Sequence, residues 1–129
     1  MIALDTNVIV RYLTLDDPDQ GPRAKAIFDR LTEDEPGFIA TVVWAETHWV
    51  LTRSYKLATD DVVKRLTALS LSDEIRAEDS AAVASAASAA RQGADFADAL
   101  IAAAATRAGC QEVVTFDKRA SSKLGWRLA

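Results

Sequence analysis

The chain has 129 residues, of which 50% are hydrophobic and 26% are charged. This length predicts one domain over residues 1–129, and this composition excludes a disordered protein. Nineteen acidic residues against fifteen Lys and Arg give a net charge of −4, which excludes a protein that coats a nucleic-acid duplex through a long basic surface.

Membrane and secretory signals are absent from the sequence. No apolar run approaches the roughly 20 residues that cross a bilayer, and Asp5 and Asn7 interrupt the apolar N-terminal segment. The single cysteine, Cys110, has no partner for an internal disulfide and is expected to be packed. We therefore expect a cytoplasmic protein with no membrane association.

Strand and helix patterns alternate along the chain. Strands are expected at residues 2–4, 38–41, 74–78, 112–116 and, more weakly, 126–128; helices are expected at 7–13, 21–34, 42–55, 59–70, 80–93 and 95–109. Thr6 or Asn7 is placed to cap the first helix, and Gly93 and Gly109 close the last two. This alternation predicts an α/β fold with a mostly parallel sheet covered on both faces.

Two of the expected strands end directly at an aspartate, Asp5 and Asp117. In such a fold the ligand site lies at the carboxyl edge of the sheet. Glu46 is near the start of the helix after the second strand, and Asp98 is in the first turn of the helix before the fourth. We therefore expect these four acids to meet at one edge, with Glu46 and Asp98 on helix lines shared with core residues.

Several acids at one edge repel one another unless a cation is present. Oxygen-only ligands suit a hard divalent ion, and one His and one Cys cannot form a zinc site. We therefore infer a site for Mg²⁺, with Mn²⁺ as a possible substitute.

Each acid also has an ordinary structural explanation. Asp5 and Asp117 suit helix caps, and Asp98 suits a first helical turn. Glu46 has basic neighbours in Arg53 and Lys56. A further acid, Asp95, fits the N-cap of the helix at 95–109, and is a secondary candidate for the metal site.

Four segments resemble the motifs of PIN-domain nucleases, in order and spacing: ALDTNVIVRYL, the glutamate within VVWAETHWVL, DFADALIAAAA and VVTFDKR. The LDTN start and the overall length most resemble the VapC-type toxins of VapBC toxin–antitoxin pairs. The resemblance runs from about Ile2 to Leu128. It implies a PIN-like three-layer α/β/α sandwich around a mostly parallel sheet of five strands.

The resemblance also implies an activity and its residues. It implies an Mg²⁺-dependent endoribonuclease that hydrolyses RNA phosphodiester bonds, forms a homodimer and is silenced by a cognate VapB-type antitoxin. Asp5 and Asp98 then ligate or bridge the metal, and Glu46 and Asp117 ligate it directly or through water. The polar residues that line or support the site are Thr6, Asn7 and Thr115.

Basic residues near these acids are candidates for phosphate contacts. Arg11 lies one helical turn beyond Asn7, and Lys118 and Arg119 directly follow Asp117. Solvated surface charge is the ordinary alternative for all three.

The sequence assigns no functional role to the remaining conspicuous side chains. We expect His48 to be structural or exposed, and Trp44 and Trp49 to lie in the core or at a dimer interface.

Two other function classes stay open. A phosphohydrolase with a phospho-aspartate intermediate would need a second aspartate two residues after Asp5, where Asn7 stands. A catalytically silent PIN-like domain that binds RNA or protein is the other.

Overall fold

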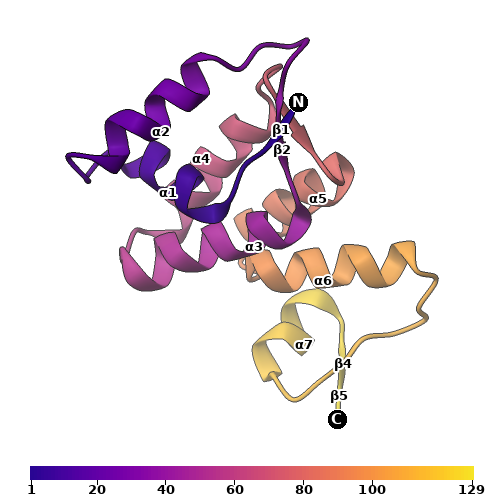
Figure 1. Ribbon diagram of the computed structural model, residues 1–129. Helices are drawn as coiled ribbons and strands as arrows, with labels where there is room; N and C mark the ends of the chain where they lie inside the picture. The colour runs from indigo at the N-terminus through magenta and orange to yellow at the C-terminus, as the bar shows by residue number, and fades with distance from the viewer.

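The computed structural model describes all 129 residues (Figure 1). The strands are β1 (Ile2–Ala3), β2 (Gly37–Ile39), β3 (Ile75–Ala77), β4 (Val114–Thr115) and β5 (Arg127–Leu128). The helices are α1 (Thr6–Thr14), α2 (Gln20–Asp29), α3 (Thr41–Trp49), the π-helix η1 (Val50–Ser54), α4 (Thr59–Ser70), α5 (Ser80–Arg91), α6 (Phe96–Arg107) and α7 (Lys118–Leu124).

The strands are all parallel but form two separate sheets. One sheet has the order β1-β2-β3, and β4 and β5 form a second, two-stranded sheet. Figure 1 shows α1 and α2 together on one side of the first sheet and α5 on the other. The α/β class with parallel strands between helices is therefore confirmed.

The expectation of one five-stranded sheet is wrong. β4 pairs only with β5, through Thr115 opposite Leu128 and Val114 opposite Arg127, so β1 keeps a free edge. The short crossover helix α7 lets β4 and β5 satisfy each other's backbone groups without β1. Apolar side chains on or next to the two sheets are exposed, among them Ile2, Val114 and Phe116.

The apolar core lies between the helices and the first sheet. Its fully buried large side chains include Ile9 of α1, Ile39 of β2, Trp44 of α3 and Phe96 of α6. Alanines on α5 and α6 let these helices pack closely against each other. This core fixes α1, α3 and α6 relative to one another.

The helix boundaries confirm most of the predicted elements and correct two details. Asp5, not Thr6 or Asn7, occupies the N-cap of α1. The helix α7 was not predicted, although Asp117 caps its start and Gly125, at φ +70°, follows its last residue. Gly93 and Gly109 also adopt positive φ just beyond α5 and α6, as expected.

None of the helices is both long and apolar enough to cross a bilayer. Cys110, expected to be packed, is exposed as a free thiol, because the turn after α6 carries it outside the core.

Thr47 offers a direct test of this packing. It is 1% exposed, and its hydroxyl has no hydrogen-bond partner. Thr47→Val keeps the shape and removes an unpaired buried polar group, so we expect the free energy of unfolding to rise by about 1 kcal/mol in urea titrations. Thr47→Ala, which also leaves a cavity, is the control and should not stabilise. Destabilisation by Thr47→Val would contradict the described packing.

Candidate functional site

The first acid group joins the start of α1 to α3. Asp5 is exposed at the N-cap of α1; its carbonyl oxygen accepts backbone hydrogen bonds from Val8 and Ile9, whereas its carboxylate does not cap the helix. Thr6, only 3% exposed, donates a hydrogen bond from its hydroxyl to the Glu46 carboxylate. The Asp5 carboxylate thus stays available beside a threonine that holds Glu46 in place.

The second acid group lies where α6 meets α7. The Asp95 carboxylate caps α6 by accepting a hydrogen bond from the Asp98 backbone N–H at 2.9 Å, as its predicted N-cap role requires. The Asp117 carboxylate caps α7 by accepting from the backbone N–H groups of Arg119 and Ala120 at 2.8 and 3.1 Å. These local bonds fix the two aspartates that flank Asp98.

Asp98 is the most perturbed of these acids. Its side chain is half-buried in the first turn of α6. Burial raises the pKa of its carboxyl above the ordinary value, and the negative charges of Asp95 and Asp117 raise this pKa further. A bound cation would reduce the repulsion among these carboxylates.

Helix α3 connects the two groups. It packs against both α1 and α6; through Glu46 it contacts Thr6, and through His48 it contacts α6. The His48 ring stacks on Phe96, with ring centroids 5.1 Å apart. Burial lowers the pKa of His48, and the nearby Asp95 charge opposes this shift. The proximity of His48 to Asp95 was not expected from the sequence, since only the packing of α3 on α6 creates it.

The polar and basic candidates divide between the same two regions. The Thr115 hydroxyl accepts a hydrogen bond from the Asp117 backbone N–H at 2.9 Å. Arg119 donates to the Gly93 carbonyl at 3.1 Å, which ties α7 to the loop before α6. Lys118 is exposed and unpaired. Asn7 and Arg11 lie on α1, beside the first group.

The structure does not gather all the acids at one sheet edge. Asp5 follows β1 and Asp117 follows β4, and these strands belong to different sheets. No three acidic, His or Cys side chains are grouped in a position to hold a metal ion. The structure instead connects the acids at two places: Glu46 bonds to Thr6, next to Asp5, and Asp98 lies within the electrostatic influence of Asp95 and Asp117, without a metal-binding arrangement at either place.

The burial of Glu46 also differs from expectation. Its spacing from Val43 and Val50 predicted that Glu46 faces the core, but Glu46 is exposed. The reason is that Val43 and Val50 are themselves only partly buried. Even so, none of the candidate acids forms an ion pair, and Glu46 contacts neither Arg53 nor Lys56. The acid set thus lacks any compensating cation from the protein.

The two tryptophans differ in environment. Trp44 is 1% exposed in the core, whereas Trp49 is 55% exposed on the surface of α3.

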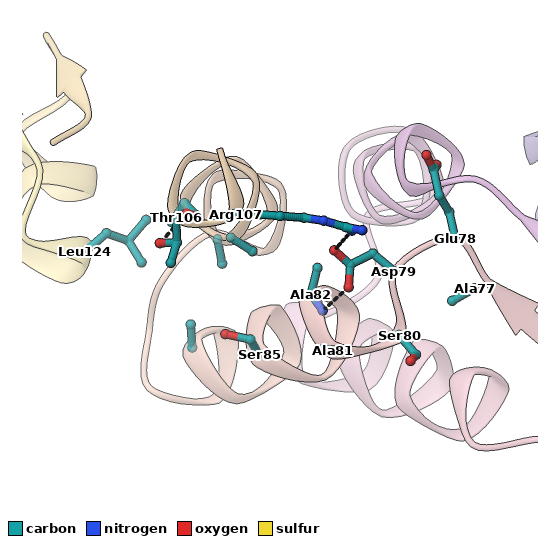
Figure 2. Close-up of a pocket in the computed structure, with 14 residues that line it drawn as sticks. Ala77, Glu78, Asp79, Ser80, Ala81, Ala82, Ser85, Thr106, Arg107 and Leu124 are labelled. Atoms are coloured by element: carbon teal, nitrogen blue, oxygen red, sulfur yellow. Dashed lines mark hydrogen bonds and ion pairs between the residues drawn. The ribbon is translucent and has the colours of Figure 1, made fainter. Parts of the chain in front are cut away.

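The largest cavity does not contain these acids. It has a volume of about 660 Å³ between α5, α6 and α7 (Figure 2). Its charged groups are already partnered: Asp79 accepts from the Ala82 backbone N–H at 3.0 Å and from Arg107 at 2.6 Å. Alanines line most of the remainder. This cavity therefore offers no unpaired group for chemistry.

A smaller pocket of about 220 Å³ lies between α1 and α2. Asn7 and Arg11 line it together with Gln20 and Arg23, two residues that the sequence did not single out. Their helix spacing places them on solvent-facing positions, so only the packing of α2 on α1 reveals the grouping.

The second acid group can be tested by titration. Asp117→Asn removes a negative charge near Asp98 but retains a side chain that caps helices well. We expect the pKa of Asp98 to fall, while staying above its ordinary value because burial remains, in ¹³C NMR titration of the metal-free protein. Asp60→Asn, on α4, is the control and should leave Asp98 unchanged. An unaltered Asp98 pKa in Asp117→Asn would contradict the described proximity.

Comparison with known proteins identifies the family. The family model described as the PIN domain matches residues 2–124, nearly the whole chain. No curated protein matches the chain.

Two solved structures are similar to the chain. One is VapC20 from Mycobacterium tuberculosis, described as a sarcin-ricin loop cleaving toxin; it is 21% identical, with 95% of this chain and 94% of that chain covered and a TM-score of 0.49. The other is FitAcB from Neisseria gonorrhoeae, 24% identical, with 99% and 96% covered and a TM-score of 0.38. Because the PIN-domain match covers almost the entire sequence, from the first strand to the end of α7, the chain belongs to the PIN-domain family.

Proposed function

We propose that this protein is a metal-dependent endoribonuclease that acts as the toxin of a VapBC-type toxin–antitoxin pair. The observation that carries the proposal is a set of acids, on a PIN-family chain, that no Lys or Arg of the protein neutralises. An acidic group held without a cation is more often functional than stabilising, since like charges raise its free energy.

The chemistry of these acids fits a hard divalent ion. Asp5, Glu46, Asp98 and Asp117 offer carboxylate oxygens. Burial, and then the charges of Asp95 and Asp117, raise the pKa of Asp98, and bound Mg²⁺ or Mn²⁺ would relieve the repulsion among these charges. Asp95 is a secondary ligand candidate. When bound, the ion would stabilise charge on the scissile phosphate and lower the pKa of a water molecule for attack.

The protein's own residues position this chemistry. Thr6 orients the Glu46 carboxylate by its hydrogen bond, and Thr115 helps to fix the backbone at Asp117. The start of α1 exposes Asp5 and Asn7 to an approaching RNA strand. Arg11, Lys118 and Arg119 supply positive charge around the acids for phosphate contacts.

A catalytically silent RNA-binding domain is the second candidate. It is favoured by the lack of any group of three or more metal-binding side chains in the structure. Under the first proposal, binding of metal and RNA draws the two acid groups together; under the second, they stay apart and no cleavage occurs.

Cleavage of a structured RNA mixture separates the two. With Mg²⁺ or Mn²⁺ we expect purified protein to cut RNA, and with EDTA we expect no cutting. Asp98→Asn should lower the rate by more than the roughly 10–100-fold typical when a residue supporting a metal ligand is lost. Asp61→Asn is the matched control, because Asp61 occupies the same first-turn position of α4 that Asp98 occupies on α6.

The outcomes of this experiment are distinct. Metal-dependent cutting that is retained in Asp61→Asn and lost in Asp98→Asn supports the ribonuclease. Equal cutting by wild type and Asp98→Asn assigns the activity to a contaminant. No cutting by any of the proteins favours the silent domain.

We also propose that a VapB-type antitoxin silences this protein in the cytoplasm and that the protein forms a homodimer. The antitoxin proposal rests on the resemblance of the LDTN start and the ordered acids to VapC-type toxins. The dimer is supported by α3, where Val42 and Trp49 are 72% and 55% exposed two helical turns apart. Large exposed apolar side chains of this kind typically mark protein interfaces.

The dimer proposal predicts a mass of twice 13.9 kDa in sedimentation equilibrium. Trp49→Ala should weaken the dimer by at least about 30-fold in Kd, as expected when a central aromatic side chain is removed. The control is Leu71→Ala, which removes another exposed apolar side chain, on the far end of α4. A wild-type protein that sediments as a monomer at every concentration would refute this interface.

A further inference from the structure

The pocket between α1 and α2 is lined by four polar side chains, Asn7, Arg11, Gln20 and Arg23, and otherwise by three apolar ones. No carboxylate lines it. We propose that this pocket binds a backbone phosphate of the RNA strand, at a position next to the one that is cut. The inference rests on the proposed ribonuclease function and adds a specific binding site to it.

Arg11 and Gln20 have hydrogen-bond donors that the protein itself does not use. Arg11 carries five N–H groups; its Nε donates to Gln20 Oε1 at 2.8 Å and its Nη1 donates to Tyr55 Oη at 2.7 Å. Its Nη2 has no partner within the protein. Gln20 uses its oxygen as the acceptor from Arg11, so its amide nitrogen also remains without one. Unused donors that face no acceptor of the protein suit an anion.

Arg11 is also preorganised. The Arg11 side chain is only 31% exposed and is held from two sides, by Gln20 on α2 and by Tyr55 after η1. Arg11 also forms an ion pair with Asp16, whose Oδ1 lies 3.8 Å from Nη1, too far for a hydrogen bond. A guanidinium fixed in this way loses little side-chain freedom when it binds a ligand.

The second arginine, Arg23, can move to a bound phosphate with little loss of folding stability. Arg23 pairs with Asp19 at 3.2 Å, but both side chains are about three-quarters exposed. Such an exposed pair contributes little stability. Arg23 can therefore leave Asp19 and pair with a bound phosphate, which then has a second positively charged partner.

The pocket also lies close to Asp5, one of the proposed metal ligands. Asp5 is the N-cap of α1, and Arg11 lies six residues later in the last turn of this short helix, which corresponds to about 9 Å along the helix axis. Asn7 lies between them and lines the pocket. A strand with its scissile phosphate near Asp5 can therefore reach this pocket with a neighbouring phosphate. This position distinguishes the pocket from isolated surface arginines, and it explains how an acidic protein retains RNA.

The test measures RNA binding rather than cleavage. A fluorescent single-stranded RNA pool of random sequence is titrated into Asp98→Asn protein in Mg²⁺, by anisotropy at several salt concentrations. We expect Arg11→Gln, added to this background, to weaken binding about tenfold for every sequence, as the loss of charge-assisted hydrogen bonds predicts. The slope of log K against log salt should fall by about 0.7, the value for one phosphate contact on a single strand.

Two further variants keep the test decisive. Arg23→Gln alters an exposed side chain and cannot disturb packing, so it should weaken binding and lower the slope in the same direction even if Arg11→Gln misfolds. Arg91→Gln, at the exposed end of α5, is the matched control and should leave both quantities unchanged.

The proposal is overturned if Arg11→Gln and Arg23→Gln, both folded by circular dichroism, bind RNA with the affinity and salt slope of the background protein. It is also overturned if these variants bind RNA normally but lose binding to an oligoglutamate peptide, because the pocket then takes the carboxylates of a protein segment. Since the readout is binding, a failure of cleavage in the wild-type protein leaves this test intact and points instead to the proposed catalysis.

Discussion

The packing of α3 between α1 and α6 is the interaction on which the candidate site depends. Helix α3 carries Glu46 toward Thr6 of α1 and His48 toward Phe96 of α6, so one helix sets the positions of both acid groups. Trp44 anchors α3 in the core at 1% exposure. Residues that are far apart in the sequence therefore share one rigid support, and the acids on either side of it need not provide any stability themselves.

The acidic charges around Asp98 lower the stability of the fold and favour the binding of a cation. Asp95 and Asp117 make local capping bonds, but burial and then the charges of these two aspartates raise the pKa of Asp98. A protein gains nothing in folding from placing these charges near one another without a cation. Arg11, in the last turn of α1, is held by Gln20 and Tyr55 and keeps unused N–H donors. An acidic site for a metal beside a basic pocket for phosphate is the arrangement that a nuclease acting on a single strand requires.

Local sequence signals predicted most of the elements, and the long-range arrangement accounts for the errors. Helical periodicity and the cap at Asp95 were readable because they depend on neighbouring residues. The pairing of β4 with β5 instead of β1 could not be predicted, since strands of two residues carry too little pattern to specify a partner. The four acids were predicted from their positions after strands and near helix starts, whereas that same pairing places the strands before Asp5 and Asp117 in different sheets. Gln20 and Tyr55 emerged only from tertiary contacts with Arg11.

The central claim is that the two acid groups serve one metal site. The most direct test is paramagnetic broadening of NMR signals by substoichiometric Mn²⁺. The account predicts that signals of Asp5, Glu46, Asp98 and Asp117 broaden together at the lowest Mn²⁺ concentration, before those of exposed acids such as Asp73. Broadening confined to one group, or spread evenly over all exposed carboxylates, would contradict a shared site.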